Sequence, residues 1–67
     1  MLNAGRGAVY VVRPGDTLWE IAQALLGAGA SEAEIVREVA RLWERNRDRI
    51  ASGSPDLIRP REKLLVR

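Results

Sequence analysis

In the stretch VVRPGDTLWEIAQALLG, residues 11–27, the residue pattern changes from one typical of a strand to one typical of a helix within a few residues. Residues 8–13, AVYVVR, contain three β-branched residues and one aromatic residue, a composition typical of a strand. Pro14 fixes its own φ at about −65° and Gly15 permits a tight reversal, so we expect the strand to end there. Apolar residues then recur at helical spacing along one face: Leu18, Ile21, Ala22 and Leu25. The stretch therefore predicts a strand, a tight turn and an amphipathic helix in immediate succession.

The start of this helix has two local explanations. Asp16 can serve as the N-cap, or Thr17 and Glu20 can form a T-x-x-E capping box. The helix is expected to run to about Leu26, where the sequence GAGA follows and Gly27 suits a left-handed cap.

A second capping box, Ser31 with Glu34, predicts a longer helix that reaches about Ile50. Its expected buried stripe consists of Ile35, Val36, Val39, Leu42, Trp43, Asn46 and Ile50. Charged residues three apart solvate the opposite face: Glu34 with Arg37, Glu38 with Arg41, and Glu44 with Arg47.

The rest of the chain supplies one more strand. Residues 51–60 carry Gly, Ser and Pro and are expected to form a loop, and residues 62–67 form a short terminal strand. Two such short strands are not stable as an isolated hairpin. We therefore predict an α+β domain over residues 8–67, in the order β-α-α-β, with a two-stranded antiparallel sheet and both helices on one face. Residues 1–7 are expected to be a disordered lead or linker remnant.

The amino-acid composition limits the kinds of site that we expect in this chain. The chain of 67 residues allows one domain, and it contains no Cys and no His, so we expect no disulfide, no metal site and no cofactor. No apolar stretch approaches the roughly 20 residues that span a bilayer. No secretory apolar segment is recognisable at the start, so we expect any export signal of a parent protein to lie outside this sequence.

Two further function classes are disfavoured. Without His or Cys, the usual catalytic base and nucleophile are missing, and a carboxylate pair such as Asp16 and Asp56 would lack an enclosed cleft in so small a domain. We therefore expect no enzymatic activity. A stripe of arginines on the second helix is also found in helix-turn-helix DNA-binding domains; here it consists of Arg37, Arg41, Arg45 and Arg49. Two features disfavour that function. The connection GAGAS between the helices is longer than the turn of that motif, and acidic residues stand between the arginines. A solvated helix face is the expected role of these arginines.

Three blocks resemble a known family, the LysM module or lysin motif. They are YVVRPGDTLWEIAQALLG, WERNRDRI and PDLIRPREKLLV, in the family's order, and together they cover residues 9–66. The most specific piece is Val11 to Ala22, and Asn46 stands where the family usually has Asn near the end of the second helix.

The resemblance implies the β-α-α-β fold and non-catalytic binding of N-acetylglucosamine-containing glycans, such as peptidoglycan or chitin. It implies a module that anchors a larger parent protein in the cell envelope or outside the cell. In the family the sugar lies in a shallow groove between the loop before the first helix and the loop after the second. Carried over by position, the two walls are Gly15, Asp16, Thr17 and Leu18, and Asp56, Leu57, Ile58 and Pro60.

Two positions depart from the family pattern. The family commonly has Gly after the last Pro, whereas here Pro60 is followed by Arg61 and Glu62; a turn with positive φ would strain Arg61. Arg45 replaces the usual Leu, and we expect its charged end to reach water. The changed turn keeps an alternative open, a protein-interaction or scaffold module that retains the fold without binding sugar.

The aromatic and amide side chains have simple structural expectations. We predict that Trp43 lies in the core, that Trp19 is half-exposed, and that Tyr10 is a strand residue facing one side of the sheet. Asn46 is expected to satisfy backbone groups at the helix end, and Asp16 to act first as a cap.

Overall fold

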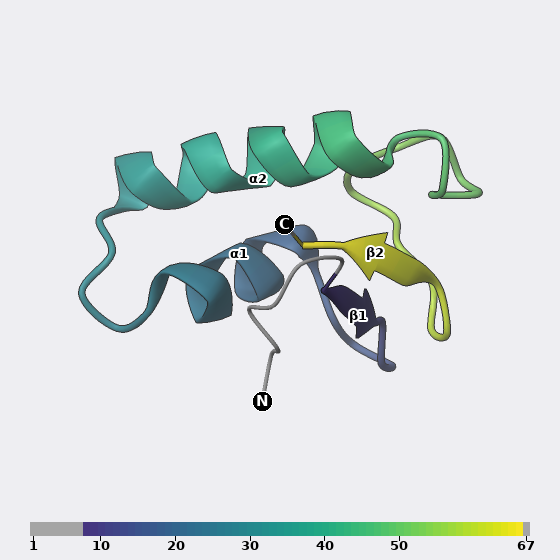
Figure 1. The fold of residues 1–67 in the computed structure, drawn as a ribbon, viewed down its shortest axis with the longest axis horizontal. Coiled ribbons are helices and arrows are strands. Elements are labelled where there is room, and N and C mark those ends of the chain that lie inside the picture. The colour runs from purple at the N-terminus through teal and green to yellow at the C-terminus, as the bar shows by residue number, and fades with distance from the viewer. Residues whose placement is uncertain (1–7, 67) are drawn as a thin grey trace.

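The computed structural model describes residues 8–66 (Figure 1). The elements follow in the order β1 (Val9–Val11), α1 (Leu18–Leu26), α2 (Glu32–Asn46) and β2 (Lys63–Leu65). This is the predicted β-α-α-β order. The lead or linker remnant expected at residues 1–7 lies outside the described residues.

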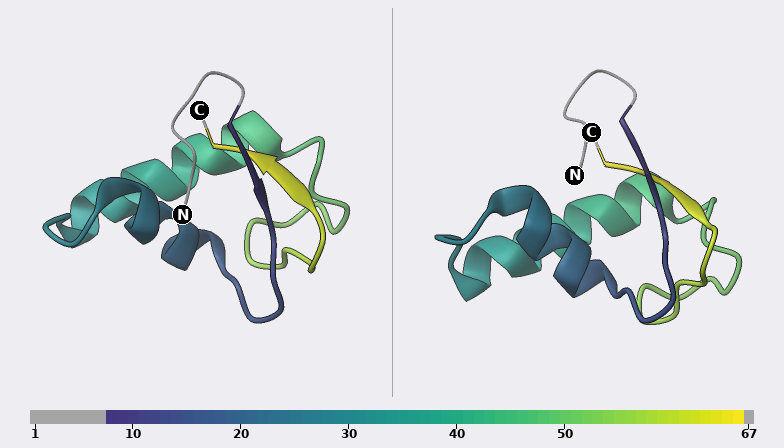
Figure 2. Two further views of the ribbon diagram at one scale, coloured as in Figure 1. Left: turned by 60° about the horizontal axis from the view of Figure 1, so that its bottom comes forward. Right: turned by 90° about the horizontal axis from the view of Figure 1, so that it is seen from below.

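The two strands form one antiparallel sheet, in which Val9 faces Leu65, Tyr10 faces Leu64 and Val11 faces Lys63. The two helices lie to the same side of this sheet (Figure 2), and α2 contacts both α1 and β2. Because side chains alternate along a strand, one face of the sheet is buried against the helices. The outward face of β1 leaves Val9 and Val11 each 48% exposed.

Both strands are shorter than predicted, three residues each. Pairing nevertheless continues past them: the Val12 N–H donates to the Glu62 carbonyl at 2.8 Å, and the Arg61 N–H donates to the Val12 carbonyl at 2.7 Å. At the other end the Val66 N–H donates to the Ala8 carbonyl at 3.1 Å. The first and last residues that the structure describes, Ala8 and Val66, are thus held side by side.

Helix α1 begins and ends where the sequence predicts. Thr17 is the N-cap, since its backbone is extended and its hydroxyl accepts the Glu20 N–H at 3.1 Å. The expectation that Asp16 acts first as the cap is wrong, because its carboxylate is bonded elsewhere. Gly27 closes the helix with φ 94° and ψ 174°, a positive φ that is not the left-handed helical conformation.

Helix α2 starts with the predicted capping box. The Glu34 N–H donates to the Ser31 hydroxyl at 3.1 Å, and the Ser31 N–H donates to the Glu34 carboxylate at 2.7 Å. The helix ends at Asn46 and not at about Ile50. The N–H groups of Arg49 and Ile50 both donate to the Asn46 carbonyl, which closes a turn and stops the regular pattern.

The core joins both helices to the inner face of the sheet. Its buried apolar members are Ala8, Val12, Leu18, Ile21, Ala22, Ile35, Leu42, Ile50, Leu64 and Val66. Trp43, which was predicted to lie in the core, is only partly buried and packs against the core. The prediction that Val36 is buried is wrong: Val36 is 53% exposed, whereas the neighbouring Ile35 is 3% exposed.

Asn46 is the buried polar residue at the centre of this packing. Its side-chain amide donates to the carbonyls of Leu42 and Leu65 at 2.9 and 2.8 Å, and its oxygen accepts the Leu65 N–H at 2.7 Å. The expectation that Asn46 satisfies backbone groups is confirmed. It also ties the end of α2 to β2, which the sequence pattern did not indicate.

Candidate functional site

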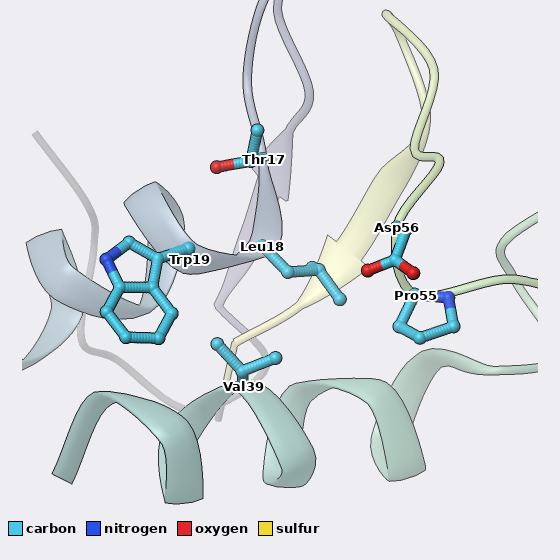
Figure 3. Close-up of a pocket in the computed structure, with 6 residues that line it drawn as sticks. All are labelled: Thr17, Leu18, Trp19, Val39, Pro55 and Asp56. Carbon is cyan, nitrogen blue, oxygen red and sulfur yellow. The ribbon is translucent and has the colours of Figure 1, made fainter. Parts of the chain in front are cut away.

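A pocket of about 210 Å³ lies where the start of α1, the middle of α2 and the loop after α2 meet (Figure 3). Its lining consists of Thr17, Leu18, Trp19, Val39, Pro55 and Asp56. Figure 3 shows Trp19 on one side, Pro55 and Asp56 on the other, and Leu18 and Val39 between them. The pocket therefore has two walls from segments far apart in sequence and an apolar floor.

The first wall is the N-terminus of α1. Thr17 keeps a hydroxyl proton to donate, because its capping bond uses the oxygen as an acceptor. The N–H groups of Leu18 and Trp19 open the helix, so no carbonyl of the helix is available to them. This wall offers several hydrogen-bond donors along its edge.

The indole of Trp19 stands at the edge between core and solvent. Trp19 is 39% exposed, whereas the neighbouring Leu18 is only 3% exposed and contributes to the floor of the pocket. An exposed aromatic face next to an apolar floor suits the C–H surface of a small, partly polar ring. The predicted half-exposure of Trp19 is confirmed.

The second wall is part of the loop between α2 and β2. The Asp56 N–H donates to the Ser54 hydroxyl at 3.2 Å, and the Ser52 hydroxyl donates to the Leu57 carbonyl at 2.5 Å. These bonds hold Pro55 and Asp56 in an ordered bend without a helix or strand. The Asp56 carboxylate is left exposed beside the pocket (Figure 3).

Glu62 anchors the far end of the same loop. Its two carboxylate oxygens accept the N–H groups of Arg59 and Ala51, each at 2.9 Å. The preceding residue, Arg61, has φ 77°, the strained conformation that the sequence indicated. The pair that replaces the family's usual Gly therefore combines backbone strain with a side chain that fastens the loop.

Asp16 organises the turn before α1. Its Oδ2 accepts the Tyr10 hydroxyl at 2.5 Å and the Arg13 N–H at 2.8 Å. These two hydrogen bonds, the Tyr10 bond foremost, lower the pKa of the Asp16 carboxyl. The same carboxylate raises the pKa of Tyr10, and partial burial adds to this rise. Tyr10 is thus more than a strand residue, because it fixes the turn to the sheet.

The predicted wall residues divide into two groups. Thr17, Leu18 and Asp56 line the pocket. The other predicted residues lie on the adjoining turns or beneath them and are not part of its lining: Gly15, Asp16, Leu57, Ile58 and Pro60. Ile58 packs against the core, and Leu57 is 52% exposed. Whether any of these eight residues contacts a ligand stays a prediction.

Sequence reasoning missed Val39 and Pro55 and left Trp19 undecided. Val39 belongs to the predicted apolar stripe of α2, but α1 leaves it half-buried. Trp19 lies one position off the stripe of α1, and this offset was a usable signal of a side chain at the edge of the core. Pro55 directly precedes Asp56, so its place in the wall follows from its neighbour.

Two arginines on or just after α2 pair with acids of that helix. Arg41 bonds Glu38 at 2.6 Å and Arg47 lies 3.4 Å from Glu44. Arg45 is exposed, as expected. Over residues 8–66, no three side chains of the metal-ligating types gather into a possible metal site. Nor does any helix within that range have the length and apolar character needed to cross a membrane.

Comparisons with known proteins bear on the family. A family model described as LysM domain matches residues 10–67. A search of curated proteins and a search of solved structures gave no match. The family match covers nearly the whole chain and agrees with the observed strand-helix-helix-strand order. This protein chain therefore belongs to the LysM domain family.

Proposed function

We propose that this chain is a non-catalytic carbohydrate-binding module that takes an N-acetylglucosamine-containing glycan, of the peptidoglycan or chitin type, in the pocket between its two walls. LysM domains are in general modules that bind such glycans and are generally not catalytic. The observation that carries the proposal for this chain is the lining of the pocket, which joins an indole and two aliphatic side chains to hydrogen-bonding groups.

The chemistry of an acetamido sugar matches these groups. Its methyl group needs a small apolar slot, which Leu18 and Val39 supply. Its carbonyl needs a donor, and the first N–H groups of α1 and the Thr17 hydroxyl lie along the edge. Its hydroxyls can donate to the exposed carboxylate of Asp56. The indole of Trp19 offers a face for the sugar ring.

The size of the pocket limits the affinity. Cavities that enclose drug-sized ligands measure about 300–1,000 Å³, and this pocket is smaller. It suits one sugar or one acetamido group, while the rest of the glycan lies on the surface. We expect dissociation constants between about micromolar and millimolar. Retention on a polymer would then depend on repeated contacts or several modules.

The arrangement of carboxylates supports a binding role without catalysis. Glycoside hydrolysis normally uses two carboxylates that flank the scissile bond. Among the described residues, Asp56 is the one carboxylate that lines the pocket. Asp16 is engaged by Tyr10 and Arg13 instead. Through such binding the module would hold a parent protein in the cell envelope or on an extracellular polysaccharide.

A titration tests the proposal. Amide NMR shifts are followed while a neutral N-acetylglucosamine oligomer is added, for the wild type, Trp19→Ala and Leu26→Ala. Leu26 is the matched control, because it is an exposed apolar residue at the opposite end of α1. We expect shifts at residues 17–19 and 55–56, a binding constant weakened about tenfold or more by Trp19→Ala, and no change with Leu26→Ala.

Two results would count against this assignment. One is the absence of shifts at millimolar oligomer, which would favour the alternative of a protein-interaction module. The other is shifts confined to the exposed face of α2, which would place the sugar outside the pocket. High salt should leave binding of this neutral ligand nearly unchanged, since no charge is neutralised.

A further inference from the structure

The positive charge of the domain is concentrated at one end of the sheet. Residues 13–16 and 59–62 form two turns that adjoin there, because the Arg61 N–H donates to the Val12 carbonyl, and Lys63, the first residue of β2, pairs with Val11. The two turns together with Lys63, here called the cationic turns, carry four exposed cations: Arg13, Arg59, Arg61 and Lys63. They also carry two acids, Asp16 and Glu62, which leaves an excess of two positive charges, equal to the formal net charge of the whole chain.

The two acids of these turns face the backbone. Asp16 accepts the Tyr10 hydroxyl and the Arg13 N–H, and Glu62 accepts the N–H groups of Arg59 and Ala51. Arg13 lies 3.8 Å from Asp16 and its side chain is 76% exposed. Within the part of the chain that the structure describes, Arg59, Arg61 and Lys63 form no ion pair. Their charges are therefore available to an external anion.

These turns adjoin the pocket. Thr17 directly follows the first turn, and Asp56 precedes the second by only three residues. Figure 3 shows both turns rising from the two walls at the same end of the pocket. A glycan chain that leaves the pocket at this end would pass the four cations.

We propose that these cationic turns bind carboxylates carried by the same glycan that occupies the pocket, so that the module selects an acidic polymer over a neutral one. This proposal rests on the proposed function. Arginine side chains pair readily with carboxylates, and an exposed pair contributes modestly and is screened by salt. The structure thus assigns the selectivity to the turns and the sugar itself to the pocket.

The experiment compares two oligomers of equal length. One is a neutral N-acetylglucosamine oligomer, and the other carries a lactyl carboxylate on every second sugar. Calorimetry at low and high salt is carried out on the wild type, on Arg59→Gln with Arg61→Gln, and on Arg37→Gln with Arg49→Gln. The last double variant is the matched control, since it removes the same charge from an exposed part of α2 and the turn after it.

We expect the wild type to bind the acidic oligomer about fivefold more tightly than the neutral one at low salt, and the difference to vanish at high salt. The turn variant should lose the difference and keep its affinity for the neutral oligomer, whereas the α2 variant should keep both. Equal binding of the two oligomers by the wild type would overturn the proposal, as would an equal loss in both variants. Failure of the neutral oligomer to bind, with the acidic preference retained, would overturn the pocket assignment instead.

Discussion

The two walls of the pocket are stabilised in different ways. The first wall follows β1 by a short turn and enters a helix, so the regular hydrogen bonds of α1 fix it after a single cap at Thr17. The second wall belongs to residues 47–62, which contain no helix or strand. There the backbone is held by short-range backbone hydrogen bonds, such as that from the Gly53 N–H to the Ile50 carbonyl, and by side chains, namely Ser52, Ser54 and Glu62. Each of these side-chain bonds depends on one replaceable residue, unlike the backbone bonds of a helix.

Asn46 is expected to show the largest effect of removing a side chain that holds the backbone. Asn46→Ala removes three hydrogen bonds and leaves the part-buried N–H and carbonyl of Leu65 without these partners, which costs about 3 kcal/mol. A domain of this size is stable by only about 3–5 kcal/mol, so we expect the variant to retain only about 0–2 kcal/mol. Urea denaturation followed by circular dichroism measures this. Gln23→Ala, which removes an exposed amide from α1, is the control, and a similar small loss in both variants would contradict the role of Asn46.

Glu62→Ala should loosen the second wall and spare the first. The loss of bonds to the Ala51 and Arg59 amides is expected to lower the free energy of unfolding by about 1 kcal/mol. Hydrogen exchange should accelerate at those two amides and stay unchanged at Glu20, whose N–H donates to Thr17. Glu44→Ala removes an exposed acid and serves as control. Uniform acceleration in both walls would show that they are not independent.

The first wall should respond to pH through Asp16 and Tyr10. Because the pKa of Asp16 is lowered on folding, its contribution is present above the unfolded pKa of about 4 and is lost as pH falls. Because the pKa of Tyr10 is raised, its contribution is present below about pH 10 and is lost as pH rises.

Stability measured across pH separates the two effects. Asp16→Asn should reduce the decrease in the free energy of unfolding at acid pH. The decrease that remains is due to groups such as Glu34, whose pKa is lowered by the Ser31 N–H. Tyr10→Phe should reduce the decrease in the free energy of unfolding at alkaline pH. An unchanged alkaline limb in Tyr10→Phe would argue against this link between strand and turn.

The smallest effect is expected at Arg61. A residue other than Gly with φ 77° stores strain, so Arg61→Gly should raise the free energy of unfolding by up to about 1 kcal/mol. Arg59→Gly is the matched control, because Arg59 has no positive φ, and it should lower stability slightly. A decrease in both variants would mean that the arginine side chain contributes more than its backbone costs.

Local signals in the sequence predicted most of the fold. The capping box at Ser31 with Glu34 and the cap at Thr17 are contacts between near neighbours, so they can be recognised from spacing alone. The end of α2 was placed too late because the apolar stripe continues to Ile50, which is buried from a turn and not from a helix. Val36 shows the same limitation, since periodicity does not reveal how wide a face α1 covers.

The candidate site was predicted only in part for a related reason. Thr17, Leu18 and Asp56 could be placed by position in the two loops. Val39 joins the pocket because two helices leave a gap above it, which is a property of packing. The roles of Asp16 and Glu62 also depend on partners, Tyr10 and Ala51, that no fixed spacing in a sequence indicates.

The pairing of Ala8 with Val66 has a mechanical consequence. Both ends of the domain leave from the same end of the sheet. Tension applied through residues 8 and 66 would separate the two strands from that end, so that their backbone hydrogen bonds break one after another. Shear across the whole sheet would not arise in this geometry. We therefore expect a pull through residues 8 and 66 to open the sheet at a lower force than a pull in shear along its strands.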